Sequence, residues 1–482
     1  MTQDDQPRVA VIGGGLSGLA TAVHLHLADP NIQLTVFEAA DRAGGVIQTL
    51  RIDPFLVDLG ADMFALEPPA AHDLCKQLNL LDQLIEPQQI GRGAYIVRQG
   101  RLVPIPDGFV LMRATKLWPM LTTKLLSPRG KLRWLVERFQ RNNVGDTDQS
   151  VAEFVRTRMG REVLQRIVGP LVAGIYTADI EKLSLLATMG PIAKMVRTHG
   201  SLAAATSARK REGQDSTERV SAGARYSQFR AFDGGMGRLI DSLIAELPDH
   251  IAALPGGVVQ TGRAVSAIEQ NTGTQPRWSV HVDDHAEAFD HVVVATPPRI
   301  AAELLQNHAP IAAKHLSSIE AASTAIVVLG VRQADLAKPI TTFGFVVPAI
   351  ENRRILACSF ASTKFAGRAP EDHLLIRVFI GGALQPQLLD LDDNELIQIA
   401  RQELSELIGL GGQSVMEKVV RWNNAMPQYH VGHLQRVREI DADINSIAGL
   451  SMVSNALHGV GIAPVIQAAK RTADRVLAEI RV

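Results

Sequence analysis

Val9-Ala10-Val11-Ile12-Gly13-Gly14-Gly15-Leu16-Ser17-Gly18 is the stretch that decides the fold of this chain. Its four apolar residues predict a buried strand, and the residues from Leu19 to about Leu27 have the composition of a helix. Gly13 permits a tight turn, Gly15 lets the backbone approach a phosphate, and Gly18 lets the helix pack closely on the strand. The helix N-terminus would offer free N–H groups to a pyrophosphate. The pattern therefore predicts a strand, turn and helix that bind a dinucleotide.

A second strand follows in register with this interpretation. Residues Ile32 to Phe37 are mostly apolar and lead into Glu38, at the spacing of about 20 residues where an acidic side chain accepts hydrogen bonds from a ribose. The next residues, Asp41-Arg42-Ala43-Gly44-Gly45, resemble the arginine and paired glycines of amine oxidases and their relatives, which bind FAD. The alternative is an ordinary glycine turn with an exposed arginine.

The C-terminus supplies a second glycine-led helix. Residues Leu450 to Ser454 predict a buried strand, and Gly459-Val460-Gly461-Ile462-Ala463-Pro464 leads into a helix that reaches Ile480. A glycine cap before a terminal helix is the alternative. The predicted fold class is α/β: a Rossmann-type, glutathione-reductase-like FAD-binding domain with a mixed-sheet substrate domain and a helical subdomain.

Two insertions separate these cofactor segments, and we expect them to form the substrate side. The segment 300–420 is rich in β-branched and aromatic runs such as Phe343 to Val347 and Leu374 to Ile380, whereas 66–228 has mostly helical spacing. Residues 201–225 lack periodicity and predict a mobile loop. The expected domains are 1–65, 229–299 and 421–482 for FAD, 66–106 and 300–420 for the substrate sheet, and 107–228 for the helical subdomain.

Composition limits the classes of partner and compartment. The chain has 482 residues, 46% of them hydrophobic, and a net charge of −1, so we expect several structural units and small-molecule partners but no nucleic acid. Its two cysteines are too few for a disulfide framework, a zinc site or an iron–sulfur cluster, and no metal is expected. No signal-peptide pattern or membrane-spanning apolar run is present, which predicts a cytoplasmic protein.

Residues 111–141 form a basic segment with a single acid, Glu137. Its cations are Arg113, Lys116, Lys124, Arg129, Lys131, Arg133, Arg138 and Arg141. Two interpretations remain open: contact with an anionic membrane surface or an acidic partner, and a solvated basic face over an internal core.

Several stretches resemble the oxygen-dependent protoporphyrinogen and coproporphyrinogen oxidases. They are Pro170-Leu171-Val172-Ala173-Gly174-Ile175-Tyr176-Thr177-Ala178-Asp179, Phe229 to Gly237, Ile355 to Phe360, and Arg421 to Tyr429 followed by Gly432-His433. The resemblance covers essentially the whole chain. It implies a six-electron, FAD-dependent oxidation of a porphyrinogen by dioxygen in haem biosynthesis, in which the protein supplies orientation and a dry pocket while the flavin accepts hydride. No protein base for proton transfer is visible.

The resemblance also implies roles for individual residues. The expected contacts of non-covalent FAD are Gly13, Gly14, Gly15, Leu16, Ser17, Gly18, Glu38, Arg42, Gly45, Val46, Gly60, Ala61, Asp62, Met63, Val265, Trp422, Gly459, Val460 and Gly461. Gly174 is expected to border the substrate through its carbonyl, and Phe345 and Leu356 to lie in the apolar wall beneath the tetrapyrrole. Each of these last three has a core or turn interpretation as an alternative.

One departure concerns the substrate's propionates. Animal and plant members carry an arginine where this chain has Ala94, just before Tyr95. Arg92, Arg98 or Lys364 could substitute, or each could be a surface charge. The residues do not decide between protoporphyrinogen and coproporphyrinogen.

Other functions and partners stay open at this point. An amine oxidase or carotenoid desaturase on the same scaffold, and a non-catalytic FAD-binding scaffold, are the alternatives. Peripheral membrane contact, contact with ferrochelatase, and a homodimer are the further associations to test.

Overall fold

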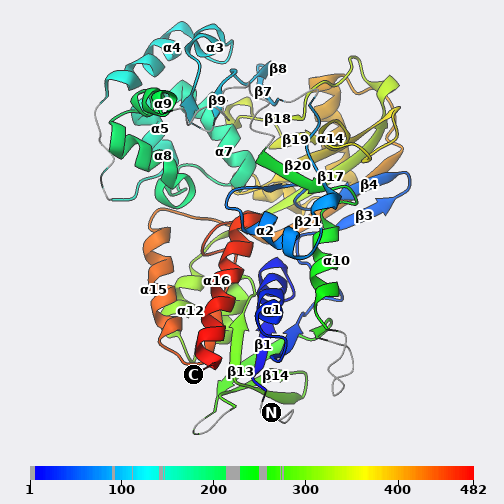
Figure 1. The fold of residues 1–482 in the computed structure, drawn as a ribbon. Helices are drawn as coiled ribbons and strands as arrows, with labels where there is room; N and C mark the ends of the chain where they lie inside the picture. Colours follow the sequence, from blue (N-terminus) through cyan, green and yellow to red (C-terminus); the bar gives the residue numbers. More distant parts are fainter. Residues whose placement is uncertain are drawn as a thin grey trace.

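The computed structural model describes residues 6–89, 93–110, 112–140, 145, 147–212, 228–248, 258–271, 273 and 276–481. Figure 1 shows a mixed α/β molecule in three parts. A lower part is built around a parallel sheet and contains both termini. Above it lie a large mixed sheet and, beside that sheet, a part made mostly of helices.

The parallel sheet has five strands in the order β12-β2-β1-β16-β22. Their bounds are β1 Arg8–Ile12, β2 Gln33–Phe37, β12 Val259–Gln260, β16 His291–Val294 and β22 Leu450–Met452. The strands predicted near both ends of the chain are confirmed, although β22 ends before the expected Ser454.

Both faces of this sheet are covered. Val9 and Val11 of β1 face one core and Ala10 and Ile12 face another, because successive strand residues point to opposite sides. The first core includes α1 Leu16–Ala28, α2 Ala70–Gln77, α10 Gly237–Glu246 and α16 Ile462–Ile480. The second includes α11 Pro298–Leu305, α12 Pro310–Ser317, α15 His433–Asn445 and the antiparallel strands β13 Val265–Gln270, β14 Trp278–Val282 and β15 His285–Phe289.

The mixed sheet has seven strands in the order β21-β17-β20-β19-β18-β7-β8. Their bounds are β7 Tyr95–Arg98, β8 Arg101–Pro104, β17 Ala321–Arg332, β18 Gly344–Val346, β19 Ala357–Phe360, β20 His373–Gly381 and β21 Met416–Pro427. One face packs on α14 Asp393–Ile408. The hairpin β3 Thr49–Ile52 and β4 Phe55–Asp58 packs on part of the other face. The predicted domain boundary between residues 420 and 421 falls inside β21.

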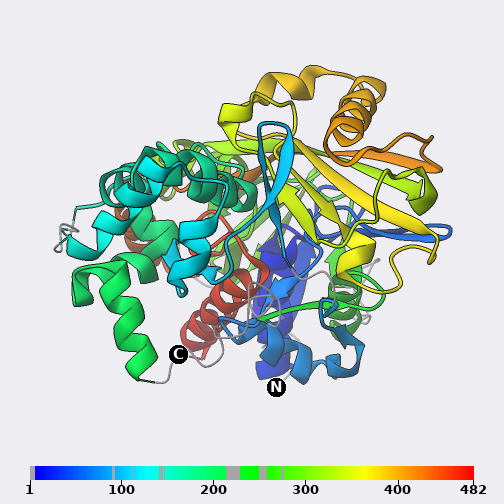
Figure 2. The same cartoon turned by 90° about the horizontal axis from the view of Figure 1, so that it is seen from above.

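The helical part lies beside the mixed sheet, as Figure 2 shows from above. Its elements are β9 Phe109–Val110, β10 Arg113–Ala114, α3 Leu117–Thr122, α4 Pro128–Leu135, α5 Val151–Met159, α6 Arg161–Val163, a π-helical turn Leu164–Val168, α7 Gly169–Tyr176, α8 Leu185–His199 and α9 Leu202–Arg211. A small sheet of β5 Phe64–Ala65, β11 Phe229–Phe232 and β6 Leu84–Ile85 connects back to the lower part. No helix within the described ranges is both long and apolar enough to cross a membrane.

The predicted loop over 201–225 is wrong for its first half, because Leu202–Arg211 form α9. The Ser201 hydroxyl accepts a hydrogen bond from the Ala204 N–H at the helix start. The buried Glu137 carboxylate accepts two more, from the N–H groups of Leu202 (2.6 Å) and Ala203 (3.2 Å). These caps satisfy the first turn, which periodicity alone does not reveal. Residues 213–227 lie outside the described part of the chain.

Candidate functional site

The glycine turn and the first acidic side chain meet at the carboxyl edge of the parallel sheet. Gly13 follows β1 with φ +112°, a conformation that favours glycine. Glu38 follows β2, and its carboxylate accepts hydrogen bonds from the N–H groups of Gly14 (2.8 Å) and Ala40 (2.9 Å). Glu38 is therefore held beside the turn, as predicted for a ribose-binding acid.

Gly15 and Gly18 serve different purposes. A Cβ atom at Gly18 would lie 1.9 Å from the Gly13 carbonyl oxygen, so the packing of α1 on its own turn requires glycine there. Among the described residues, no atom would lie within 4 Å of a Cβ at Gly15, which is the N-cap of α1, and no side chain caps this helix. The protein's own packing leaves space at Gly15, and the open helix N-terminus suits a phosphate. The residues present therefore fit a dinucleotide.

The loop after Glu38 lies against the same turn. The Gly44 N–H donates to the Gly14 carbonyl (2.7 Å), and a Cβ on Gly45 would come within 3.5 Å of the Gly15 Cα. The Arg42 guanidinium donates to the carbonyls of Ala43 (2.9 Å) and Gly45, and so orders its own loop. Burial lowers the pKa of Arg42, with Glu38 opposing. Val46, at the end of this loop, is 40% exposed.

The C-terminal loop ends in a second open helix N-terminus. Gly461 is the N-cap of α16, and no side chain caps it. Because β22 is parallel to β1 and β16, the loop leaves the sheet at the same edge as the first glycine turn. Val460 packs against the core of the helical part. Two helix N-termini from opposite ends of the chain therefore lie at one edge of the sheet.

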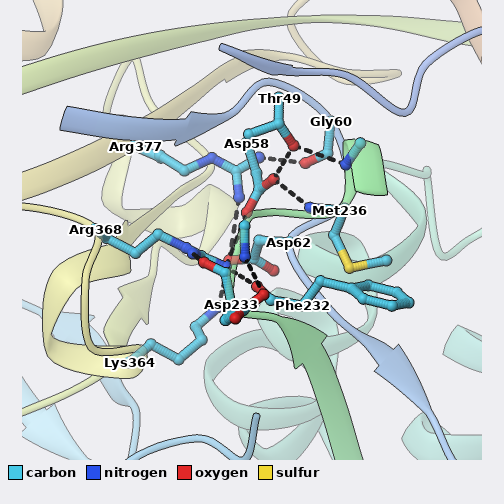
Figure 3. Close-up of polar contacts among 12 residues, drawn as sticks. Thr49, Asp58, Gly60, Asp62, Phe232, Asp233, Met236, Lys364, Arg368 and Arg377 are labelled. Atoms are coloured by element: carbon cyan, nitrogen blue, oxygen red, sulfur yellow. Dashed lines mark hydrogen bonds and ion pairs between the residues drawn. The ribbon is translucent and has the colours of Figure 1, made fainter. Parts of the chain in front are cut away.

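The predicted cofactor segment Gly60–Met63 is supported by a buried ion cluster, which we define as Asp58, Asp62, Lys364, Arg368 and Arg377 (Figure 3). The Asp62 carboxylate pairs with the Lys364 ammonium (2.7 Å) and the Arg377 guanidinium (3.1 Å). Burial alone would raise the pKa of Asp62, but the two cations lower it to about 2. Asp62 is therefore ionised and held from two sides.

The buried ion cluster joins segments that are far apart in the sequence. Arg377 also donates to the Gly60 carbonyl, and Arg368 donates to the carbonyls of Phe232 and Asp233 (both 2.7 Å). The Asp58 carboxylate accepts from the Thr49 hydroxyl (2.6 Å) and the Met236 N–H (2.7 Å). The cluster thus fixes the Gly60–Met63 segment relative to β20 and to the start of α10. Next to it, the Trp422 indole donates to the Leu59 carbonyl (2.8 Å).

Gly174 lies where the helical part meets the mixed sheet. It is in the last turn of α7, and a Cβ atom there would come within 3.3 Å of the Val346 side chain in β18. No described residue donates a hydrogen bond to the Gly174 carbonyl, as is common in the last turn of a helix. Val346, Val460 and Tyr176 all pack against the core of the helical part. Gly174 of the predicted substrate helix therefore lies against Val346 of the sheet wall, and Val460 of the C-terminal glycine loop packs on the same core.

The structure separates the two predicted wall residues. Leu356 is half-buried and lies close to Thr177 at the end of α7, since a Cβ on Gly382 would touch both. Phe345 is 1% exposed and packs with Phe360 in the core beneath α14. Its neighbour Val346 points to the Gly174 side instead. A contact between Phe345 and substrate stays a prediction.

Sequence reasoning missed Val346 and Phe379. Phe379 is half-buried, is opposite Ala357 and Ile326 in register, and lies on the face away from α14. The sequence holds a signal for this position. Arg377 is the one charge in an apolar strand, and residues two apart lie on the same face, so Phe379 shares the face that holds the charged side chain.

The remaining predicted site residues have mixed positions. Arg92 is outside the described residues. Arg98 ends β7 and is half-buried. Burial opposes ionisation of Glu162 in the helical part, but hydrogen bonds from Ser127 and then the charges of Arg166 and Arg98 lower the pKa of that carboxyl. Lys364 is buried in the ion cluster, so it is not a surface charge. Val265 begins β13, and the strand that joins the parallel sheet beside Glu38 is β12, whose Gln260 carbonyl accepts from the Glu38 N–H.

Comparisons with known proteins agree with this arrangement. A coproporphyrinogen III oxidase of Staphylococcus aureus is 32% identical over 475 residues, covering 98% of this chain and 99% of that protein. A protoporphyrinogen oxidase 2 of Arabidopsis thaliana is 26% identical over 493 residues, covering 98% and 94%. A crystal structure from Exiguobacterium sp. 255-15, of a protein proposed to be a protoporphyrinogen oxidase, superposes with a TM-score of 0.84 at 26% identity, covering 98% and 99%.

The family model for flavin-containing amine oxidoreductases matches residues 16–477. This match begins directly after Gly15 and includes Glu38, the ion cluster, the Gly174 region and the C-terminal glycine loop. The chain belongs to the flavin-containing amine oxidoreductase family.

Proposed function

We propose that this protein is an FAD- and oxygen-dependent porphyrinogen oxidase of haem biosynthesis, with coproporphyrinogen III as its substrate. The observation that carries the proposal is the similarity along almost the whole chain, at about one-third identity, to the S. aureus coproporphyrinogen III oxidase. The lower identity to the plant protoporphyrinogen oxidase favours coproporphyrinogen over protoporphyrinogen.

The carboxyl edge of the parallel sheet would hold FAD. Support comes from the open space at Gly15, the carboxylate of Glu38 and the uncapped N-termini of α1 and α16. The remaining FAD contacts expected from the sequence belong to this proposal, and so does the glutathione-reductase-like Rossmann description. The proposed domain division is also kept, except for the boundary between residues 420 and 421, which lies inside β21. Both cysteines are buried, and burial raises the pKa of each thiol, which fits non-covalent binding.

The substrate would lie between α7 and the mixed sheet. Val346, Leu356 and Phe379 present an apolar surface there, and the Gly174 carbonyl is the polar group free to face an acidic pyrrole N–H or the proton it releases. When FAD is bound, it supplies the two-electron acceptor, which dioxygen then reoxidises. Six hydrogens leave the porphyrinogen in three steps, so three dioxygen molecules become three hydrogen peroxide molecules. The chain's own role is to orient the macrocycle and exclude water.

The test uses the purified holoprotein with coproporphyrinogen III and protoporphyrinogen IX in parallel. Each is mixed without oxygen, the flavin absorbance is followed, and oxygen is then admitted while porphyrin fluorescence and peroxide are measured. We expect rapid flavin bleaching and the larger kcat/KM with coproporphyrinogen III. Neither bleaching nor fluorescence above the rate of free FAD would overturn the oxidase assignment, and a larger kcat/KM with protoporphyrinogen would overturn the substrate choice.

A second proposal concerns the basic segment of the helical part, whose elements α3 and α4 lie at the outer end of the molecule in Figure 1. Trp118, Leu132 and Phe139 are 73%, 66% and 84% exposed. Lys124, Arg129 and Arg138 are exposed nearby in the sequence. We propose that this surface contacts an anionic membrane peripherally, because large exposed apolar side chains beside cations are typical of interfacial binding.

Vesicle sedimentation separates this from a solvated basic face. Arg133 is excluded from the test, because its guanidinium donates to the carbonyls of Thr157 and Arg158 inside the helical part. Reversing Lys124, Arg129 and Arg138 to Glu should abolish binding to phosphatidylglycerol vesicles, and Trp118→Ser with Phe139→Ser should weaken it at unchanged charge. Wild-type protein that stays in the supernatant at low salt would contradict the proposal.

A further inference from the structure

Two aromatic rings lie between the helical part and the C-terminal glycine loop. Tyr429 is 3% exposed, His433 is fully buried, and their rings stack with centroids 3.8 Å apart and planes 12° from parallel. Tyr429 is the second residue after the end of β21, and His433 is the first residue of α15. We call the two residues the ring pair.

The ring pair hydrogen-bonds to the backbone of the stretch between β22 and α16 at three alternate residues, Asn455, Leu457 and Gly459. The Tyr429 hydroxyl donates to the Asn455 carbonyl (2.5 Å) and accepts from the Gly459 N–H (2.8 Å). The His433 Nε2 lies 3.1 Å from the Leu457 carbonyl, and it carries the proton because a carbonyl can only accept. The stretch between β22 and α16 is thereby held at three points.

Both rings are neutral in the folded protein. Burial raises the pKa of the Tyr429 hydroxyl, and burial lowers the pKa of His433 to about 4. The hydroxyl therefore keeps its proton and can be donor and acceptor at once. Its two partners are backbone groups of the half-buried residues Asn455 and Gly459, so the hydroxyl satisfies one acceptor and one donor of this stretch.

The same segment is anchored to the helical part. The Tyr429 carbonyl accepts from the Ser184 N–H (2.7 Å), and the Val431 N–H donates to the Lys182 carbonyl (2.9 Å). The Gln428 side chain donates to the Tyr176 carbonyl (3.2 Å) at the end of α7, the helix that contains Gly174. The ring pair is thus fixed on one side before it contacts the loop on the other.

We propose that Tyr429 and His433 are positioning residues that hold the Gly459–Gly461 loop in the conformation that binds FAD. The inference rests on the cofactor placement under the proposed function. Gly459 has φ +132°, and a Cβ atom there would come within 2.6 Å of Pro464, so the loop enters α16 through a narrow turn. The hydrogen bond from its N–H to Tyr429 fixes that turn before a ligand arrives. Preorganisation of this kind raises affinity because less order has to be imposed on binding.

The experiment titrates FAD into apoprotein and compares Tyr429→Phe with wild type. Tyr429→Phe keeps the ring and removes both hydrogen bonds, so we expect FAD affinity to fall about tenfold. Tyr95→Phe is the matched control, since Tyr95 packs in the core on the α14 side of the mixed sheet, and it should bind FAD like wild type. His433→Asn keeps an N–H donor and should bind FAD more tightly than His433→Phe, which keeps only an aromatic ring.

A second measurement separates positioning from general stability. The urea midpoint of each apoprotein is measured, together with the visible circular dichroism of the bound flavin. A positioning role predicts a changed circular dichroism spectrum of the flavin bound to Tyr429→Phe. It also predicts that Tyr429→Phe loses more FAD affinity than a variant elsewhere in the chain whose apoprotein has the same urea midpoint. Unchanged FAD affinity, or a loss that follows apoprotein stability alone, overturns the inference. A holoprotein that binds FAD but oxidises no porphyrinogen defeats the proposed function and leaves this inference standing, whereas a wild type that binds no FAD defeats both.

Discussion

The parallel sheet and the mixed sheet build their candidate binding surfaces from different atoms. At the edge of the parallel sheet, the surface is mostly backbone with the Glu38 carboxylate beside it: Gly15, Gly45 and Gly461 have no side chains, and within the described residues the helices that follow Gly15 and Gly461 have no side-chain cap. On the mixed sheet, the surface is made of side chains such as Val346 and Phe379, supported by the buried ion cluster.

This difference separates general from specific recognition. Backbone N–H groups at a helix start suit any ligand that carries a pyrophosphate, and the same edge therefore serves many flavin enzymes. A wall of side chains selects a ligand by shape, and its chemistry changes with each substitution. The parallel-sheet edge should therefore respond to added volume, and the mixed-sheet side to changes in charge or side-chain shape.

The largest expected effect comes from adding volume at Gly15. Gly15→Val has room in the protein and an extended backbone that valine adopts easily, with φ −72° and ψ 178°. Its side chain would occupy the space proposed for the pyrophosphate. We expect FAD affinity to fall at least about 1,000-fold, or about 4 kcal/mol, with little change in the urea midpoint of the apoprotein.

Gly18→Ala is the comparison for this variant. Its methyl group would clash with the Gly13 carbonyl oxygen, so the apoprotein itself should lose stability. If Gly15→Val protein purifies yellow with full FAD occupancy, Gly15 does not border the pyrophosphate. That result would contradict both the different roles of the two glycines and the proposed placement of the cofactor.

The parallel-sheet edge was readable from the sequence because its parts are local. The turn after β1, the acid after β2 and the glycines before α16 each lie within a short segment whose pattern shows strand, turn and helix. Unlike β21, strands β18 and β20 of the mixed sheet were also predicted, from their β-branched and aromatic runs. Their order in the sheet was not, since pairing between β17, β20 and β21 depends on contacts far apart along the chain.

The mixed-sheet surface was harder to predict for the same physical reason. In strand β18, the Phe345 side chain packs in the core on the α14 side of the sheet and the Val346 side chain packs on the helical part. A shift of the strand register by one residue would exchange these two faces. The partners of Asp62 are more than 300 positions away, and nothing near Asp62 indicates them. Glu137 was grouped with a basic surface, yet it is buried and caps α9.

An intermediate effect is expected from the buried ion cluster, which has three cations and two acids. Asp62→Asn leaves Lys364 and Arg377 without their shared counter-charge in a buried place. We expect the free energy of unfolding to fall by about 3 kcal/mol, measured by urea denaturation at fixed FAD concentration.

Two further variants sharpen this result. Asp62→Asn with Lys364→Met restores the original charge balance of the cluster, so it should recover part of the loss. Glu181→Gln removes an exposed ion pair with Arg156 and should cost less than about 1 kcal/mol. If Asp62→Asn is as mild as Glu181→Gln, the cluster does not support the Gly60–Met63 segment.

The smallest effect distinguishes the two regions by pH. In the parallel-sheet region, burial lowers the pKa of His24 to about 4 and of His291 to about 3, from 6.5. Below pH 6.5 the unfolded chain binds protons that the folded form does not, so stability falls as the pH falls. Each histidine should cost about 2 kcal/mol at pH 5. Asp62 acts in a lower window, because its stabilisation is complete above its unfolded pKa of 3.8 and is lost only as the pH falls toward about 2.

Acid should therefore loosen the parallel sheet before the mixed sheet. Hydrogen exchange at pH 5, compared with pH 7.5 after correction for intrinsic rates, should show protection lost in α1 and β16 while β20 keeps its protection. His24→Leu cannot take up a proton in its buried position against α16, so it should flatten the fall of the urea midpoint between pH 7.5 and 5. Equal loss of hydrogen-exchange protection in β16 and β20 at pH 5 would show that acid destabilises the two sheets as one unit. If the urea midpoint of His24→Leu falls with pH as steeply as that of wild type, protonation of this buried histidine does not cause the loss of stability in acid.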